Sequence, residues 1–228
     1  MAKLMFISYP HNPTGAVCDI KFFEKVVDWA RGKNIIIAHD LTYSDIVYDG
    51  YRAPSFLQVK GSRDFGIEFH TLSKSYNMAG WRIGYVVGNA AILKTLAKTK
   101  NYLDFGIFRP IQEAATAALE GPQDHVAAMV KLYKERRDLL VDGLNAIGWK
   151  TEKPKATFYV WTKIPLKYSA LTALEFASLL LDESGVVVSP GTGFGEYGEG
   201  FVRFALVQDK DRISQALKKI KLFLDSKD

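Results

Sequence analysis

The chain has 228 residues, of which 48% are hydrophobic, enough for one large domain or two smaller ones with separate cores. Its formal net charge is +5, but the basic residues are spread along predicted helices without an arginine-rich run, which argues against nucleic-acid binding. The single cysteine, Cys18, excludes an intrachain disulfide, and no run of about 20 apolar residues predicts a membrane-spanning helix. We therefore expect a cytoplasmic protein that binds neither nucleic acid nor a membrane.

Short apolar runs alternate with helical patterns through the first half of the chain. Continuous apolar strands of this length are typical of a mostly parallel sheet covered by helices, so this part is predicted to be α/β. An alanine-rich helix is expected at Ile111–Leu119. Before it, we predict strands at Leu4–Tyr9, Asn34–Ala38, Ile67–Leu72 and Trp81–Val87, and helices at Phe22–Ala30 and Ala90–Lys100.

A long amphipathic helix is predicted within residues 121–147. We take it as the connection between part of a large domain, residues 1–120, and a small α/β domain, residues 148–228. The elements expected in the small domain are a strand at Phe158–Thr162, a helix at Leu171–Glu183, a strand at Val186–Ser189, a glycine-rich loop at Gly191–Gly200, a strand at Phe201–Leu206 and a helix at Asp209–Leu224.

Polar residues follow several of the predicted strands. Asn12, Asp40 and Lys74 each come just after a strand, and ligands of open α/β sheets bind beyond the carboxyl ends of the strands. We therefore expect these side chains to share one rim of the sheet. Lys74 lies in a turn of small and hydroxylated residues that includes Thr71, and Arg82 follows it. This pattern suggests a bound anionic cofactor, and the alternative is a solvated loop lysine.

A lysine amine can bond covalently to a carbonyl compound, and pyridoxal phosphate (PLP) needs such a lysine. PLP also needs a carboxylate that faces its ring nitrogen, and Asp40 has the right type and position. The alternative for Asp40 is a helix N-cap ahead of Leu41–Val47. His39 and His70 lack metal-ligand partners at suitable spacing, so we expect structural roles for them and no metal site.

Four segments of the chain resemble one family, the class I/II PLP-dependent aminotransferases of fold type I. They are YPHNPTGA from Tyr9, AHDLTYSDIVY from Ala38, TLSKSYNMAGWRIG from Thr71 and GEGFVRFAL from Gly198. Within the family, the stretches Asp45–Gly61 and Ile67–Asn89 look most like LL-diaminopimelate aminotransferases and alanine-type relatives. The resemblance implies the C-terminal part of a PLP-transferase large domain, with a mostly parallel sheet, followed by a small α/β domain.

The resemblance also implies which residues would contact the cofactor. Lys74 would be the Schiff-base lysine, and it would move the proton between the substrate α-carbon and the cofactor. Asp40 would pair with the ring nitrogen. Tyr43 and Asn12 would hydrogen-bond the ring 3-oxygen and bias its ionisation.

The same resemblance assigns the phosphate and the substrate to other residues. Arg82 and the Thr71 hydroxyl would hold the phosphate, and Arg203 would grip the substrate α-carboxylate through its two-pronged donors. The expected reaction moves an amino group between an amino acid and a 2-oxo acid. The chain departs from the family at Thr71, where serine is usual, and at His11, where asparagine is common; we interpret His11 as a packing variant.

Family members are longer than this chain, which is expected to be the C-terminal part of an aminotransferase that is a homodimer at full length. The resemblance implies that an N-terminal arm, a glycine-containing phosphate loop and a ring-stacking aromatic residue are missing. Alone, the chain is then expected to bind PLP poorly and to expose apolar edges. Two alternatives stay open, namely an inactive fragment or assembly partner, and another fold-type I enzyme such as a C–S lyase.

Overall fold

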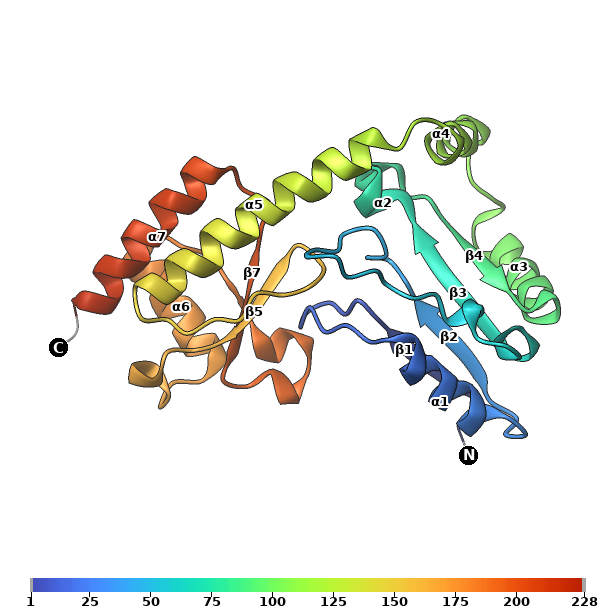
Figure 1. Cartoon of the computed structure of the whole chain (residues 1–228), viewed down its shortest axis with the longest axis horizontal. Helices are drawn as coiled ribbons and strands as arrows, with labels where there is room; N and C mark the ends of the chain where they lie inside the picture. Colours follow the sequence, from blue (N-terminus) through green and yellow to red (C-terminus); the bar gives the residue numbers. More distant parts are fainter. Residues whose placement is uncertain (1, 227–228) are drawn as a thin grey trace. The chain divides into compact units, whose positions relative to one another are not determined.

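The structure is a computed structural model that describes residues 2–226, and contacts divide the chain into two units. One unit holds the chain up to His11 together with Val17–Val130, and the other holds Asn12–Ala16 together with the chain from Lys131 onward. The division falls within the long helix α5, Asp124–Ala146, which is labelled in Figure 1. The assignment of residues 1–120, 121–147 and 148–228 to functional domains stays a prediction.

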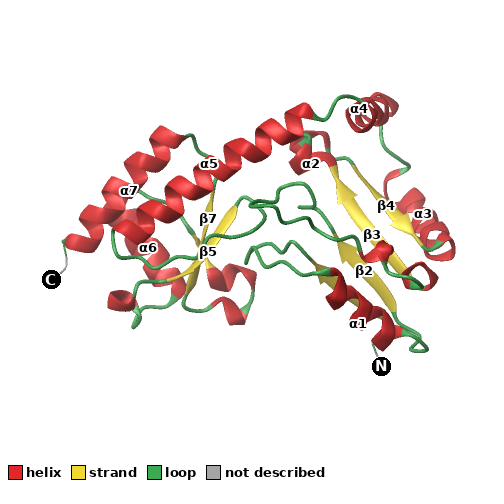
Figure 2. Cartoon of the chain, in the orientation of Figure 1, coloured by secondary structure: helices red, strands yellow, loops and turns green. Residues whose placement is uncertain are grey.

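The first unit is built on a sheet with the strand order β1-β2-β3-β4, of which β2, β3 and β4 are labelled in Figure 2. The first three strands run parallel, and β4 runs antiparallel to β3. The strands are β1 (Leu4–Ser8), β2 (Ile36–Asp40), β3 (Gly66–Thr71) and β4 (Gly84–Gly88). The predicted α/β class with a mostly parallel sheet is therefore confirmed.

The direction of β4 follows from the short connection that precedes it. This connection contains α2 (Leu72–Ser75) and the 3-10 helix η3 (Ala79–Trp81), and it returns the chain to the end of the sheet that β3 has just reached. The strand predicted from Trp81 begins only at Gly84, because Arg82 adopts a left-handed backbone, with φ of 53°, at the end of η3.

Helices cover the first sheet and fix the β3–β4 connection. On one face, Phe23 of α1 (Ile20–Ala30) packs into a buried cluster with Ile7 and Ile37 of the strands. A second cluster includes Leu72 of α2, and it contains Ala115 of α4. The remaining helices of the unit are α3 (Ala90–Asp104) and α4 (Arg109–Glu120). None of the described helices in either unit has the length and apolar character needed to span a bilayer.

A buried polar network lies within the first sheet. His39 is fully buried and Glu68 is 2% exposed. The Glu68 carboxylate accepts hydrogen bonds from His39 Nδ1 at 3.0 Å, His70 Nε2 at 2.9 Å, the Phe56 N–H at 2.9 Å and the Ser55 hydroxyl at 2.9 Å. Burial alone would raise the pKa of Glu68, but the hydrogen bonds from His39, His70 and Ser55 outweigh it and lower this pKa to about 2. Both histidines therefore have the structural roles expected of them.

The second unit is built on an antiparallel sheet with the strand order β5-β7-β6. Side chains that point to one side of this sheet, such as Val160 and Val202, are fully buried. On the same side, Trp149 contacts the Phe204 ring edge-to-face at 5.5 Å. The elements are β5 (Tyr159–Lys163), α6 (Ala173–Ser184), β6 (Ser189–Pro190), β7 (Phe201–Ala205) and α7 (Lys210–Asp225), together with the C-terminal part of α5.

The strand predicted at Val186–Ser189 is wrong in its position, because β6 consists of Ser189 and Pro190 alone. The chain leaves α6 through Gly185, which has the left-handed conformation that ends helices. Val187 is then 74% exposed and lies outside the sheet. Pro190 lacks the N–H that would extend a ladder, which restricts this strand to the sheet edge.

Candidate active site

Asp40 is the last residue of β2, where the strand opens into a turn. Its Oδ1 accepts hydrogen bonds from the Thr42 N–H, at 3.0 Å, and from the Thr42 hydroxyl. Residues 41–47 form no helix, so the alternative that Asp40 is a helix N-cap is wrong. Among the described residues, no donor is hydrogen-bonded to Oδ2. One oxygen of the carboxylate therefore orders the turn, and the other is available to a ligand.

A predicted site residue, Tyr43, and the family departure His11 both lie near this carboxylate. Tyr43, in the same turn, is only 4% exposed. Burial lowers the pKa of His11, while the charge of the nearby Asp40 acts in the opposite direction. The interpretation of His11 as a residue that packs beside the site is consistent with this proximity.

Lys74 lies in α2, a single helical turn directly after β3. The turn begins at Thr71, whose hydroxyl accepts a hydrogen bond from the Ser73 N–H at 3.1 Å. The helical turn α2 is also connected to the turn that follows β2, because the Ser75 hydroxyl donates a hydrogen bond to Asp45 Oδ2 at 2.5 Å. The half-buried lysine is thus carried on a segment that is fixed on both sides.

Arg82 lies just before β4, and its Nη1 donates to the Ala79 carbonyl at 2.9 Å. The pairing of Thr71 with Gly84 places Arg82 next to the end of β3. The Thr71 hydroxyl in turn donates to the Ile83 carbonyl at 3.4 Å. Thr71 and Arg82 therefore lie at the same end of the sheet, and the exposed guanidinium of Arg82 is open to an anion.

Arg203 of β7, in the second unit, is surrounded by neutral groups. Its Nη1 donates to Asn12 Oδ1 at 2.7 Å, and its Nη2 donates to the Ser189 hydroxyl at 3.4 Å. Its Cζ lies 4.0 Å from the centroid of the Tyr159 ring and 4.4 Å from that of Phe194. Nε is buried and has no hydrogen-bond partner among the described residues. Such a guanidinium can take a carboxylate in the two-pronged geometry that arginine favours.

Asn12 reaches Arg203 because its loop packs on the second unit. Gly15 has a left-handed φ of 68°, and a Cβ at this position would lie 2.9 Å from the Cβ of Pro154, so glycine is required here. Pro154 is held in turn by Arg137, which is 1% exposed and donates from Nη1 to the Pro154 carbonyl at 2.9 Å. The segment NPTG thus directs the side-chain oxygen Oδ1 of Asn12 to Arg203 and leaves the Nδ2 donors of this side chain for a ligand.

The predicted residues therefore fall into two groups. The second unit brings Asn12 and Arg203 together. The first unit holds the other predicted residues, which are Asp40, Tyr43, Thr71, Lys74 and Arg82. Their groups are a carboxylate, a phenol, a hydroxyl, an amine and a guanidinium, which are the groups needed to bind an aldehyde cofactor that carries a ring nitrogen and a phosphate.

The family model for aminotransferase class I and II matches residues 1–220. The chain belongs to this family. It is 51% identical over 223 residues to the LL-diaminopimelate aminotransferase of Moorella thermoacetica, a match that covers 98% of this chain and 56% of that protein. It is 55% identical over 219 residues to the glutamate-pyruvate aminotransferase AlaC of Escherichia coli, covering 96% and 53%.

A solved structure of similar fold is that of apo-BacF from Bacillus subtilis. It matches with a TM-score of 0.92 and 38% sequence identity, over 97% of this chain and 56% of that chain. The chain therefore spans little more than half the length of these relatives.

The sequence did not reveal the residues that surround Arg203. Strand alternation offers a partial signal, because Arg203 pairs across the sheet with Ser189 and Trp161, and directly paired residues point to the same side. Tyr159 lies two residues from Trp161 on β5, so it also points to that side. Phe194 comes from a loop, and no sequence period places it.

The loop that supplies Phe194 is the glycine-rich segment Gly191–Gly200. It contains two short 3-10 helices, η5 (Gly191–Phe194) and η6 (Glu196–Gly198), and it leads directly into β7, as expected. A Cβ on Gly191 would lie 2.0 Å from the Gly198 carbonyl oxygen, so the two glycines let the loop close on itself.

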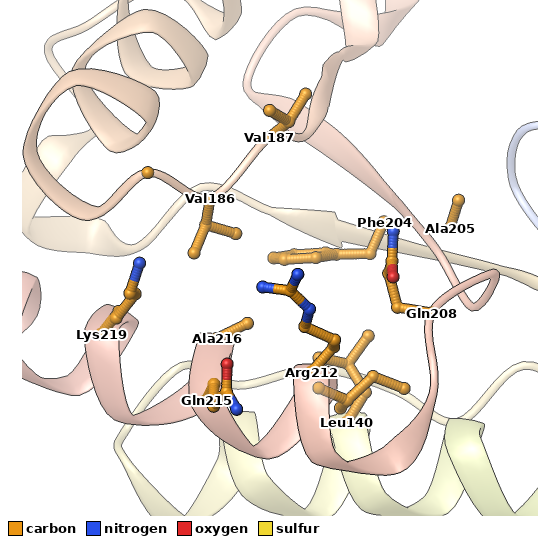
Figure 3. A pocket seen from close by; sticks show the side chains of 12 residues that line it. Leu140, Val186, Val187, Phe204, Ala205, Gln208, Arg212, Gln215, Ala216 and Lys219 are labelled. Carbon is orange, nitrogen blue, oxygen red and sulfur yellow. The ribbon is translucent and has the colours of Figure 1, made fainter.

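A separate cavity of about 420 Å³ lies in the second unit, beside α7 (Figure 3). Arg212 and Lys219 of α7 line it together with Phe204 of β7, and none of the predicted site residues does. Phe204 and Arg203 are consecutive in a strand and point to opposite sides of the sheet. The cavity and Arg203 therefore belong to different faces of the second sheet.

Proposed function

We propose that the chain carries the cofactor lysine and the substrate-carboxylate arginine of a PLP-dependent aminotransferase, which moves an amino group between an amino acid and a 2-oxo acid. One observation carries the proposal. Lys74 lies on a short helix that Thr71 and Ser75 hold in place. This helix follows the C-terminal end of β3, next to Asp40 at the C-terminal end of the neighbouring strand β2. Membership of the aminotransferase family supports the class of reaction.

When bound, PLP supplies an aldehyde carbon that receives the amino group and a ring that accepts electrons from the substrate. The side chains of the first unit fit this group. Lys74 would hold it through Nζ, and the Oδ2 oxygen of Asp40 would face the protonated ring nitrogen. Tyr43 would donate to the ring oxygen, while Thr71 and Arg82 would hold the phosphate at the end of β3.

The chain's own groups would perform two tasks on the substrate. Lys74 would take the proton from the substrate α-carbon as a base and would then donate it, as an acid, to the cofactor carbon that receives the amino group. Arg203 would hold the α-carboxylate through its guanidinium donors, of which Nε has no partner within the described chain, and this contact would fix the orientation of the substrate. Asn12 supports this role by accepting a hydrogen bond from Nη1.

The substrates, the partner and the compartment form part of the proposal. The two relatives are named for LL-diaminopimelate and for glutamate and pyruvate, which favours LL-diaminopimelate or glutamate as the amino acid and pyruvate as a 2-oxo acid. The cytoplasm is proposed as the compartment, and a homodimer at full length is supported by a segment of exposed apolar residues that a partner could cover. These are Tyr102, Leu103, Phe105 and Phe108, which are 72% to 93% exposed.

Trapping of the cofactor tests the central claim. The 228-residue chain is incubated with PLP, reduced with borohydride and analysed by peptide mass spectrometry. Because the chain alone is expected to bind PLP poorly, PLP is supplied in excess. We then expect a reduced pyridoxyl adduct on Lys74, and none at this position in a Lys74→Arg variant. The absence of an adduct on Lys74 in the unaltered chain would support an inactive fragment or assembly partner instead.

Assays with alanine or LL-diaminopimelate as amino donor and 2-oxoglutarate as acceptor then test the reaction. Glutamate formation that depends on Lys74 would support the transfer reaction. Release of ammonia and pyruvate from a sulfur-containing amino acid, without amino transfer, would favour a C–S lyase.

A further inference from the structure

The surroundings of Arg203 form an aromatic face on one side of the second sheet. Arg203 lies opposite Trp161 on β5 and opposite Ser189 on β6. Its guanidinium carbon is 4.0 Å from the Tyr159 ring centroid and 4.4 Å from the Phe194 ring centroid. A guanidinium is attracted to the face of an aromatic ring, and this contact does not use its N–H donors. The two rings can therefore hold the group in place and leave its hydrogen-bonding edges available.

The charge of Arg203 supports the same conclusion. Its hydrogen-bond partners are the amide oxygen of Asn12 and the hydroxyl of Ser189, and both are neutral. Among the described residues, no acidic side chain forms an ion pair with it. A carboxylate neighbour would occupy the donors and compete with an incoming anion, whereas aromatic rings do not. Nε is buried, and it has no hydrogen-bond partner within the described chain.

The glycine-rich loop explains how Phe194 is placed. Gly191 and Gly198 approach so closely that a Cβ on Gly191 would lie 2.0 Å from the Gly198 carbonyl oxygen. This contact closes the loop around η5, whose last residue is Phe194. Phe194 also contacts Trp161, with ring centroids 6.0 Å apart in an edge-to-face arrangement. Its ring is thus fixed from both the loop and the sheet.

We propose that Phe194 and Tyr159 are positioning residues that hold the Arg203 guanidinium, through its contacts with their rings, in the orientation that receives the substrate carboxylate. This inference rests on the proposed function, in which Arg203 binds that carboxylate. It assigns the glycine-rich loop a role in substrate binding, because the loop presents one of the two rings.

The first test does not depend on catalysis. In the full chain labelled with 15N-arginine, the Nε–H signal of Arg203 is assigned by its loss in an Arg203→Lys variant and is then titrated with acetate. We expect Phe194→Leu to move this signal and to weaken acetate binding roughly tenfold, the size of effect expected for a lost cation–π contact. Phe194→Tyr keeps a ring and should behave like the unaltered chain.

Phe201→Leu is the matched control. Phe201 projects from the same strand to the same side as Arg203, but it stacks on Trp161, with ring centroids 5.3 Å apart. We expect it to lower thermal stability without changing the acetate dissociation constant. The proposal would be overturned if Phe194→Leu changed neither the Nε–H signal nor acetate binding, if Phe201→Leu weakened acetate binding equally, or if the unaltered chain did not bind acetate at Arg203.

A kinetic test separates this inference from the proposed function. In a transaminating preparation, Phe194→Leu should raise KM for the amino acid roughly tenfold and change kcat less than twofold. A roughly tenfold fall in kcat with no change in KM would contradict a positioning role. If amino transfer is not found at all but the Arg203 signal still responds to acetate and to Phe194→Leu, the proposed function fails and the role of the rings stands.

Discussion

Replacement of Glu68 by glutamine removes the charge of the buried carboxylate with little change in shape. Glu68 is 2% exposed, and its hydrogen bonds from His39, His70 and Ser55 lower its pKa from 4.5 to about 2. Each pH unit between these values corresponds to about 1.4 kcal/mol, so the ionised carboxylate contributes about 3 kcal/mol to the free energy of unfolding at neutral pH. We expect Glu68→Gln to lose about this amount at pH 7.

The pH dependence of this loss tests the reasoning. Because the folded pKa lies below the unfolded value, the contribution is fully present above about pH 4.5 and disappears as the pH falls toward 2. Urea unfolding is followed by circular dichroism between pH 7 and pH 3. The difference in the free energy of unfolding between the unaltered chain and Glu68→Gln should shrink below pH 4.5. Glu152→Gln, at an exposed position, is the control and should show no such gap. A gap that stays constant down to pH 3 would refute the assignment of the stability to the charge of Glu68.

Three further predictions follow from local contacts. Ser75→Ala leaves Asp45 without a charge-assisted hydrogen bond, so it should lower the free energy of unfolding by about 2 kcal/mol in urea titrations. It should also slow the borohydride trapping of PLP on Lys74, which timed mass spectrometry measures. Burial raises the pKa of Cys18 to about 11, so its alkylation by iodoacetamide at pH 8 should be slower than that of free cysteine and should accelerate as the pH rises toward 11. Trp149→Ala should cost about 3–5 kcal/mol in a urea titration, because this side chain is 1% exposed within the second unit's core, and a loss below 1 kcal/mol would contradict that placement.

Much of the first unit could be predicted because its signals are local. The apolar spacing of Phe22–Ala30 predicted α1, which the structure places at Ile20–Ala30. Short apolar runs likewise predicted β1, β2 and β3 to within about two residues. The helical turn that carries Lys74 was predicted only as a loop, because a helix of four residues is too short to show a hydrophobic period.

The contacts of the candidate site were harder to predict because they depend on pairing between distant strands. Asp40 was correctly placed at a strand end, but its use of one oxygen to order the turn at Thr42 follows from a local conformation that has no apolar pattern. The rings beside Arg203 depend on the register of β5 against β7 and on the closure of the glycine-rich loop. Neither is encoded in the spacing of a single segment.

The hydrogen bond between Asn12 and Arg203 has a consequence for the order in which the chain is made. The two residues are 191 positions apart, so the first leaves the ribosome long before the second is synthesised. Closing a chain segment of this length costs about 5 kcal/mol of backbone freedom, and packing within the second unit, such as that of Gly15 against Pro154, has to offset it. The group that would grip the substrate is therefore completed only when β7 has been translated and paired, and a chain whose synthesis stops before β7 lacks it.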